Sequence, residues 1–428
     1  MMNWTINKVS KICGSISVPG DKSITHRAVI LSAISSGESQ IENYLPSQDC
    51  ISTIKAFEKL GVRIENDGHS LKIHGVGLKG LKSYNGVINA GNSGTTARLL
   101  SGVLAGQNFT SKISGDESLS KRPMRRIIEP LELMGANIIA KDGNYLPIEI
   151  KGNSNLKAIE YLSPVSSAQV KSCVLLAALF VKGTTEFEEP IKSRDHTERM
   201  FKDRGADIKV DGNVIRINGG HDLKSKNIEI PGDISSAAFF LVAASILKNS
   251  KVTIKNVGIN STRDGIIKIL EKMGLKISKD NNREISGEPV SDISVEYSPL
   301  STVDINEDII PSLIDEIPII VLAATQADGR TKISGAKELK VKESDRLKSI
   351  STELNKMGAN IQETQDGLII SGRTNLKGTK VKSHGDHRIA MTLAIAGLIA
   401  DGKTQIEDVD CVSTSFPNFY EILEGIIK

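Results

Sequence analysis

The chain has few aromatic residues and almost no net charge. Aromatic residues make up 4% of its 428 residues, one of them tryptophan, and the formal net charge is +3. Proteins that bind nucleic acid usually need aromatic side chains for base stacking or a broad cationic surface. The composition therefore argues against a nucleic-acid partner.

Cysteines and long apolar runs are also scarce. The four cysteines form no C-x-x-C pair, and Cys173 lies in the apolar run CVLLAALF, which predicts a small buried side chain. The longest apolar stretch, residues 237–247, is roughly half the length that a membrane span needs. Because no apolar signal segment opens the chain, we expect a cytoplasmic protein without targeting signal or membrane contact.

Several catalytic signatures are missing. The segment GDKS around Lys22 lacks the G-x-x-x-x-G-K-[ST] spacing of a nucleotide-binding loop, and no glycine-flanked serine nucleophile occurs. The histidines His26, His196 and His387 have no metal-ligand spacing. The sequence thus disfavours an ATPase and predicts no metal site.

A pattern of one helix, a glycine and a polar-turn hairpin recurs along the chain. With 39% apolar and 25% charged residues, the chain is long enough for two domains with real cores. Each helix stops where glycine can adopt the left-handed conformation, and D-G, N-D-G or D-N-N turns follow. The copies start at Ala56, Pro130, Arg199, Ile269 and Glu353. Repeats of this length predict an α/β protein of stacked supersecondary units.

A sixth copy is split between the two ends of the chain. The sequence ends in a helix-like FYEILEGIIK without strands and begins with strand-like residues 4–18 without a helix. We therefore expect the N-terminal strands to complete the last repeat, giving one domain of residues 20–232 and another of residues 1–19 and 233–428. Each would hold three repeats. Pro-Gly pairs at Pro19 and Pro231 suggest a two-strand hinge, although such pairs also occur in ordinary loops.

Short cationic segments recur next to apolar helical runs. The segment GNSGTTAR, residues 91–98, offers glycines for close backbone approach, donors on Asn92, Thr95 and Thr96, and a helix start, which suits an anion. The other segments are PGDKSITHR, KRPMRR, SRDH, VKESDR and GDHR. So many of them predict a crowded anionic site.

Individual charged residues allow a structural and a functional interpretation. Lys22 is a solvated surface lysine or a phosphate contact, and a lone arginine is more often a surface residue. Arg122, Arg346 and Arg388 come from both halves of the chain, which favours a ligand clamped by two domains. Asp315 stands with Glu316 before an apolar run, where carboxylates either cap a helix or accept a proton.

Taken in order, these segments resemble a known family. PGDKSITHR, GNSGTTAR, KRP, SAQVKS, SRDHTE, PGDISSAAFF, IDEIP, VKESDR, GDHR and TSFP are similar to the segments of 3-phosphoshikimate 1-carboxyvinyltransferases, or EPSP synthases. GDKS, SAQ and SRDH resemble the second class of that family. The resemblance covers nearly the whole chain. It implies the enolpyruvyl transferase fold, with two similar domains of three βαβαββ repeats joined by a two-strand hinge.

The resemblance implies a transferase of the shikimate pathway of aromatic amino acid biosynthesis. Its members move the enolpyruvyl group of phosphoenolpyruvate to the 5-hydroxyl of shikimate 3-phosphate by addition and elimination, without a cofactor. Binding of shikimate 3-phosphate is thereby assigned to Lys22, Ser23, Arg27, Ser167, Ala168, Gln169, Arg194, Asp315 and Lys342. Binding of phosphoenolpyruvate is assigned to Lys22, Asn92, Gly94, Arg122, Gln169, Arg346 and Arg388.

Three residues receive proton-transfer roles from the resemblance. Asp315 is expected to accept the proton of the 5-hydroxyl, while Glu343 and Lys22 are both candidates for proton transfer at carbon. Glyphosate is expected as an inhibitor and a monomer as the assembly state. Thr414 stands where many first-class members have lysine, and Gly94 is alanine in some tolerant relatives, so glyphosate sensitivity stays open.

Two other functions compete with this assignment. The sister enzyme that uses UDP-N-acetylglucosamine normally has a reactive cysteine before the Arg-Pro pair, whereas this loop is GDESLSKRP. A non-catalytic anion-binding scaffold would explain the repeats but not the carboxylates among the arginines. The sequence favours the shikimate 3-phosphate enzyme over both.

Overall fold

The computed structural model describes residues 2–428 and divides the chain into two compact units. The first unit comprises Gly20–Ile230 and Ile285–Gly287, and the second comprises Met1–Pro19, Pro231–Glu284 and Glu288–Lys428. The chain therefore passes into the first unit after Pro19 and leaves it after Ile230.

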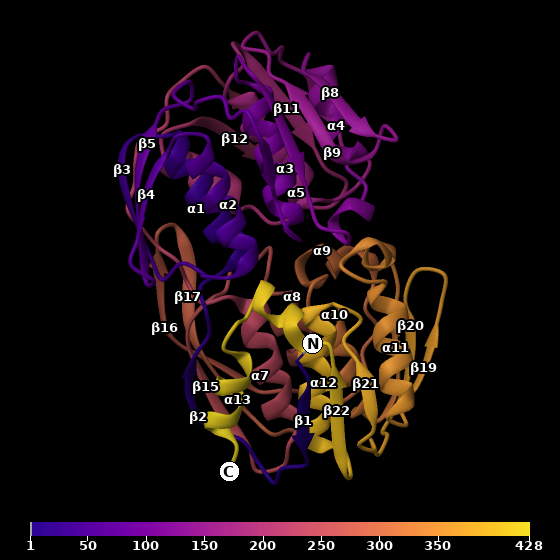
Figure 1. Ribbon diagram of the computed structural model, residues 1–428. Helices are drawn as coiled ribbons and strands as arrows, with labels where there is room; N and C mark the ends of the chain where they lie inside the picture. The colour runs from indigo at the N-terminus through magenta and orange to yellow at the C-terminus, as the bar shows by residue number, and fades with distance from the viewer. Residues whose placement is uncertain (1) are drawn as a thin grey trace. The chain divides into compact units, whose positions relative to one another are not determined.

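The first unit contains three four-stranded sheets of identical topology (Figure 1). In each sheet an edge strand pairs in parallel with its neighbour, which pairs antiparallel with a β-hairpin. In spatial order the strands are β14 (Ile228–Glu229), β3 (Ser36–Glu42), β5 (Ser70–Val76) and β4 (Arg63–Asn66); β6 (Val87–Asn89), β7 (Thr110–Ser114), β9 (Tyr145–Lys151) and β8 (Asn137–Lys141); and β10 (Glu160–Leu162), β11 (Thr184–Glu188), β13 (Val214–Asn218) and β12 (Asp207–Asp211).

Each repeat of the first unit adds one buried and one amphipathic helix. The buried helices are α1 (Lys22–Ile34), α3 (Gly94–Ala105) and α5 (Ala168–Ala178), and the amphipathic helices are α2 (Gln48–Lys59), α4 (Arg125–Leu133) and α6 (His196–Asp203). A short 3-10 helix, η1 (Leu119–Lys121), precedes α4. Beyond α2 and α4, Gly61 and Gly135 have φ values of 87° and 95°, so glycine ends these helices as predicted.

Within the described residues, the second unit has one four-stranded sheet and two three-stranded sheets. In spatial order their strands are β16 (Ile277–Ile285), β17 (Glu288–Glu296), β15 (Lys251–Gly258) and β2 (Cys13–Ser17); β18 (Gly329–Ile333), β20 (Leu368–Gly372) and β19 (Asn360–Glu363); and β1 (Trp4–Asn7), β22 (Lys403–Glu407) and β21 (Lys380–Lys382). The helices are α7 (Ile234–Ile246), α8 (Gly265–Lys272), α9 (Ile310–Leu313), α10 (Ile317–Thr325), α11 (Arg346–Lys356), α12 (His387–Ile399) and α13 (Phe419–Ile426). The 3-10 turns are η2 (Glu307–Ile309), η3 (Lys337–Val341) and η4 (Val409–Thr414).

The two N-terminal strands lie in different sheets. β1 pairs antiparallel with β22 in the sheet of the last repeat, and Trp4 on β1 stacks on Phe419 of α13 with ring centroids 5.7 Å apart. β2 instead pairs in parallel with β15, a strand of the sheet that follows Pro231. The sequence pattern could not show that β2 joins a different sheet from β1, because both strands are short and neither has a hairpin partner next to it in the chain.

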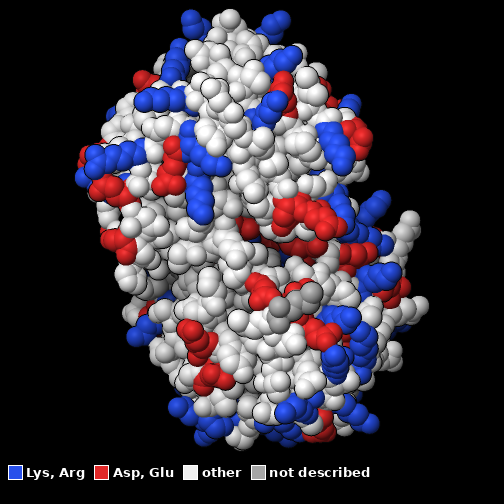
Figure 2. All heavy atoms as spheres, viewed as in Figure 1, with Lys and Arg blue, Asp and Glu red and all other residues white. Residues whose placement is uncertain are grey.

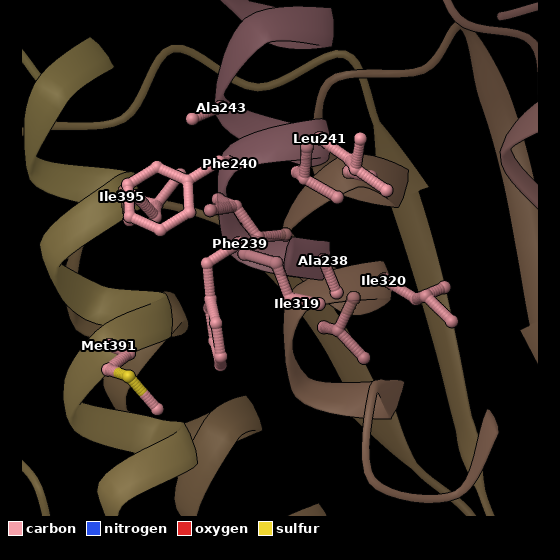
Figure 3. Packing of buried hydrophobic residues seen from close by; sticks show 14 of the residues in the cluster. Ala238, Phe239, Phe240, Leu241, Ala243, Ile319, Ile320, Met391 and Ile395 are labelled. Atoms are coloured by element: carbon pink, nitrogen blue, oxygen red, sulfur yellow. The ribbon is translucent and has the colours of Figure 1, made fainter. Parts of the chain in front are cut away.

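The core of the second unit is formed by helices that are apolar on all sides. Figure 3 shows Phe239 and Phe240 of α7 packed among side chains of α10 and α12, including Ile319, Met391 and Ile395. A helix without a polar face has to be covered all round. The surrounding sheets and amphipathic helices provide this cover, and the starts of the buried helices still present backbone amides that have no partner within the helix.

Charged side chains of both signs are distributed over the face shown in Figure 2, as expected from a net charge of +3. No helix among residues 2–428 is long and apolar enough to cross a membrane.

Candidate active site

In the first unit, the predicted site residues gather at the starts of the three buried helices. Each start has a side-chain cap: Asp21 accepts a hydrogen bond from the Ile24 amide, Ser93 from Thr96 and Ser167 from Val170. Uncapped amide groups and the positive end of the helix dipole attract anions at such positions. The three helix starts therefore form the framework of a candidate anion site.

Lys22 is not a solvated surface lysine. Its Nζ lies 2.9 Å from Oδ2 of Asp49 in the first turn of α2, and the two side chains are 18% and 9% exposed. This partner was missed at the sequence level, because nothing in the pattern around Asp49 separates it from an ordinary helix-capping acid. The pair holds the lysine head group in a fixed, half-buried position.

Arg27 connects three helices. Its guanidinium donates to the Ser23 carbonyl (2.9 Å), to Ser172 Oγ of α5 (2.6 Å) and to Thr197 Oγ1 of α6 (2.7 Å). A longer bond of 3.5 Å reaches the carbonyl of Ala168. Arg27 thus ties the Lys22–Ser23 turn to the start of α5.

Arg122 lies beside Asn92. The resemblance assigns both residues to phosphoenolpyruvate. Arg122 Nη2 donates to Asn92 Oδ1 at 2.6 Å and to Ser118 Oγ at 3.1 Å, while the amide of Asn92 donates to Asp116 at 2.8 Å. Gly94 opens α3 next to this pair. A Cβ atom on Gly94 would stand 2.6 Å from Nη1 of Arg98, so a side chain at this position requires the guanidinium to shift.

Arg98 is a residue whose role the sequence did not reveal. Its Nη1 donates to Oε1 of Gln169 at 2.8 Å and its Nη2 to the carbonyl of Pro123 at 3.0 Å. The amide of Gln169 donates in turn to Thr95 Oγ1 at 3.0 Å. Arg98 therefore joins α3, the start of α5 and the loop after Arg122.

The prediction that Thr96 offers a donor to an anion is wrong. The Thr96 side chain is buried and hydrogen bonded to Ser93 and Thr53, because its position on α3 faces the core. Thr53 also bonds the buried His26 ring at 2.7 Å. Burial, followed by the charges of Lys22 and Arg27, lowers the pKa of His26 well below 6.5, so this ring is neutral.

Arg194 is half-buried in the loop before α6 and approaches α1. Its Nη1 lies 3.4 Å from Oγ of Ser23. Ser167, Ala168 and Gln169 occupy the cap and first turn of α5. The structure therefore brings together, within the first unit, the predicted residues on α1, α3, α5 and the Arg194 loop.

In the second unit, a fully buried arginine is surrounded by carboxylates. Arg346 lies 2.8 Å from Asp386, 3.1 Å from Asp315 and 2.5 Å from Glu343. Burial alone would lower the pKa of the guanidinium, but the three carboxylates outweigh it and raise the pKa far above its usual range. Asp315 therefore pairs with an arginine. Its neighbour Glu316, at the cap position of α10, makes no side-chain capping bond.

Arg388 is also buried, and it lies at longer distances from Asp315 and from Glu316. Its Nε lies 3.6 Å from Asp315 and its Nη1 3.9 Å from Glu316. Glu316 is itself fully buried and accepts a hydrogen bond from Ser235 at the start of α7. Lys342 is half-buried directly after η3 and next to Glu343.

Among the described residues, the cysteines give no sign of a reactive thiolate and the acidic groups no sign of a metal site. Cys50 and Cys173 are buried, which raises the pKa of both thiols far above 9, and burial raises that of Cys411 to about 12. These thiols are therefore protonated at neutral pH. Among residues 2–428, no group of three His, Cys, Asp or Glu side chains is placed to hold a metal ion.

The first unit thus presents cations and helix starts suited to anions, and the second presents arginines with adjacent carboxylates suited to proton transfer. Together with the repeated sheets and hairpins, these features define an enolpyruvyl transferase. The family model described as EPSP synthase (3-phosphoshikimate 1-carboxyvinyltransferase) matches residues 6–423. The chain belongs to this family.

Curated relatives and solved structures support the same family assignment. A 3-phosphoshikimate 1-carboxyvinyltransferase of Endomicrobium trichonymphae is 55% identical over 431 residues, and one of Bacillus cereus (strain B4264) is 50% identical over 430 residues, each match covering 100% of both chains. An EPSP synthase structure from Acinetobacter baumannii superposes with a TM-score of 0.89 at 43% identity, covering 100% of this chain and 98% of that one. The predicted family, fold class and enzyme class are therefore confirmed.

Proposed function

We propose that this enzyme transfers the enolpyruvyl group of phosphoenolpyruvate to the 5-hydroxyl of shikimate 3-phosphate. In the addition step, the hydroxyl oxygen attacks C2 of phosphoenolpyruvate while a proton is added to its C3 methylene, giving a tetrahedral ketal with a methyl group. In the elimination step, the methyl group loses a proton and the bond from C2 to the phosphate oxygen breaks. The products are 5-enolpyruvylshikimate 3-phosphate and inorganic phosphate.

Shikimate 3-phosphate is proposed to bind at the helix starts of the first unit. A phosphate and a carboxylate need several donors at once, and an arginine can hold either group with two parallel hydrogen bonds. The proposed contacts in this unit are Lys22, Ser23, Arg27, Ser167, Ala168, Gln169 and Arg194. The hydrogen bonds that link α1, α5 and the Arg194 loop support their acting as one site.

Phosphoenolpyruvate is proposed to bind through groups of both units. Asn92, Gly94 and Arg122 would hold its phosphate, with Lys22 and Gln169 nearby in the same unit, as the bond of 2.6 Å from Arg122 to Asn92 supports. Arg346 and Arg388 of the second unit would hold its carboxylate. Lys342, with Asp315, completes the proposed contacts to shikimate 3-phosphate.

One observation carries the acid–base assignment. Asp315 and Glu343 both contact Arg346, at 3.1 and 2.5 Å, on its two terminal nitrogens. If Arg346 holds the carboxylate of phosphoenolpyruvate, both acids lie within a few ångströms of the carbons that react. Asp315 would accept the hydroxyl proton, while Glu343 or Lys22 would exchange the proton at C3.

Further proposals follow from the same contacts. Glyphosate carries a phosphonate and a carboxylate, so we propose that it competes for the phosphoenolpyruvate contacts; titrating turnover with glyphosate at several phosphoenolpyruvate concentrations tests this. A monomeric state and a cytoplasmic location are proposed as well. Sedimentation velocity and cell fractionation would test them.

The proposed function is tested by phosphate release. The enzyme is incubated with phosphoenolpyruvate and either shikimate 3-phosphate or UDP-N-acetylglucosamine as acceptor. Release with shikimate 3-phosphate only is expected. Release with the nucleotide sugar would assign the sister activity, and release with neither acceptor would overturn the proposal.

A further inference from the structure

A lysine with no solvent exposure lies behind the proposed shikimate 3-phosphate site. Lys171 is on α5, and its Nζ lies 2.7 Å from Glu189 Oε1, 2.7 Å from Glu198 Oε1 and 3.3 Å from the Ser193 carbonyl oxygen. An ammonium group has three N–H donors. Lys171 therefore donates hydrogen bonds to Glu189 and to the Ser193 carbonyl, and it forms an ion pair with Glu198.

Its partners come from three successive segments of the chain. Glu189 directly follows β11, Ser193 is in the loop before α6, and Glu198 is on α6. Glu189 Oε1 also accepts a hydrogen bond of 2.9 Å from the Ser193 amide. Both polar groups of the Ser193 backbone are thus fixed by this cluster.

The fixed residue directly precedes Arg194, one of the proposed contacts to shikimate 3-phosphate. The cluster holds both the N–H and the C=O group of Ser193, so the backbone of Arg194 can move little. The cluster therefore limits where the Arg194 guanidinium can reach. α5, which carries Lys171, also carries Ser167 and Gln169 in its cap and first turn. The cluster consequently sets the position of the Arg194 loop relative to the start of α5.

A second set of buried hydrogen bonds also links α5 to α6, through the residues next to Lys171 and Glu198. Ser172 beside Lys171 and Thr197 beside Glu198 bond each other at 2.7 Å, and both accept from Arg27 of α1. Two adjacent buried polar layers therefore join α1, α5 and α6. These elements and the loop before α6 contain every proposed shikimate 3-phosphate contact of the first unit.

Stability does not require a charged cluster at this position. Replacing buried ion pairs by apolar groups of similar volume is often neutral or stabilising, because burial of each charge is costly. Burial lowers the pKa of Lys171, but Glu198 and Glu189 outweigh that effect and raise it, so the lysine stays charged. The charges therefore point to a geometric role rather than to a gain in stability.

We propose that Lys171, with Glu189 and Glu198, is a positioning cluster that holds the Arg194 loop against the start of α5 for recognition of shikimate 3-phosphate. This inference rests on the proposed function. None of the three side chains is proposed to touch a substrate. They act through the position of Arg194.

The test uses Glu198→Gln in the full-length enzyme. This change removes one charge, keeps the side-chain shape and leaves Lys171 paired with Glu189. Calorimetric titration with shikimate 3-phosphate alone should give a dissociation constant at least about tenfold higher than wild type, since misplaced binding groups lose affinity without losing the fold. At saturating shikimate 3-phosphate, KM for phosphoenolpyruvate and kcat should stay within about threefold.

Two further variants keep the test decisive. The combined Lys171→Met, Glu189→Gln and Glu198→Gln variant removes all charges from the cluster and should also bind shikimate 3-phosphate weakly, even if Glu198→Gln fails to fold. Glu353→Gln is the matched control. Its carboxylate is fully buried in the second unit with Lys356 and His384 at 2.8 and 2.7 Å, and its substitution should leave the dissociation constant unchanged.

The outcomes separate the two proposals. Wild-type affinity in a folded charge-free variant would overturn the positioning role, even if its melting temperature fell. An equal rise in KM for both substrates would also overturn it, because that result indicates a general loss of structure. If the wild-type enzyme neither binds shikimate 3-phosphate nor releases phosphate with it, the proposed function fails together with this inference.

Discussion

Arg98 donates a hydrogen bond of 2.8 Å from Nη1 to Oε1 of Gln169. With its second bond to the Pro123 carbonyl, at 3.0 Å, this arginine connects the residues proposed for both substrates within the first unit. Its guanidinium has little freedom to move, since both of its terminal nitrogens are used. Any group that presses on Arg98 should therefore disturb Gln169 and the Arg122 loop.

Gly94→Ala should weaken phosphoenolpyruvate binding. The added Cβ would stand 2.6 Å from Arg98 Nη1, so the guanidinium would have to shift and its bonds to Gln169 and Pro123 would be disturbed. We expect KM for phosphoenolpyruvate to rise by about tenfold, with a smaller change in kcat. Steady-state kinetics measure this, and Gly425→Ala, where an added Cβ has no neighbour within 4 Å, is the control. An unchanged KM would show that Arg98 adjusts without cost.

The sequence was a good guide where local rules decide the structure. Helix ends at Gly61 and Gly135 followed from the left-handed conformation that glycine tolerates, and the following hairpins from their polar turns. The start of α3 in GNSGTTAR followed from its composition. These features depend on neighbouring residues, so a single sequence contains the information.

Other features depend on contacts between distant segments. The partners of Arg27, Ser172 and Thr197, are 145 and 170 residues away, and no local pattern identifies them. The same limit applies to Arg98 with Gln169, and to β2, which pairs with β15. Thr96 was misjudged because helix periodicity turns it toward the core, whereas Thr95 is half-buried and faces Gln169. Most of the fold was thus predictable, and the supporting contacts of the site were not.

Arg346→Met and Arg388→Met should separate stability from activity. Arg346 forms ion pairs with three close carboxylates, so its loss should lower the free energy of unfolding by about 3–5 kcal/mol in urea denaturation. Arg388 has only contacts of 3.6 and 3.9 Å, and its loss should cost clearly less. Both variants should lose turnover, because both arginines are proposed to hold phosphoenolpyruvate. Equal destabilisation by the two substitutions would contradict the difference in pairing.

Asp315→Asn should slow turnover while keeping the fold. The amide oxygen of asparagine can still accept a hydrogen bond from Arg346, which lies 3.1 Å from Asp315, but the amide cannot take the hydroxyl proton. Loss of a general base typically lowers kcat by about 10²–10⁴-fold. Phosphate release measures kcat, and circular dichroism checks the fold. Asp328→Asn at an exposed position is the control, and wild-type turnover in Asp315→Asn would remove the proposed role.

His26 should make the enzyme less stable in mild acid. Burial lowers the pKa of the folded-state ring well below 6.5, so the unfolded chain binds the proton first as the pH falls. Stability should therefore be fully present above about pH 6.5 and decrease below it, by at most about 1.4 kcal/mol per pH unit from this group. His26→Asn, which can still bond Thr53 from the Nδ1 position, should be less stable overall but should lose less stability between about pH 6.5 and 5. Urea denaturation across this range compares the slopes, with the exposed His221→Asn as control. Carboxylates titrate in all three proteins, so only the difference in slope between wild type and His26→Asn reports on His26. Parallel curves of unfolding free energy against pH for these two proteins would mean that the buried ring is protonated without cost.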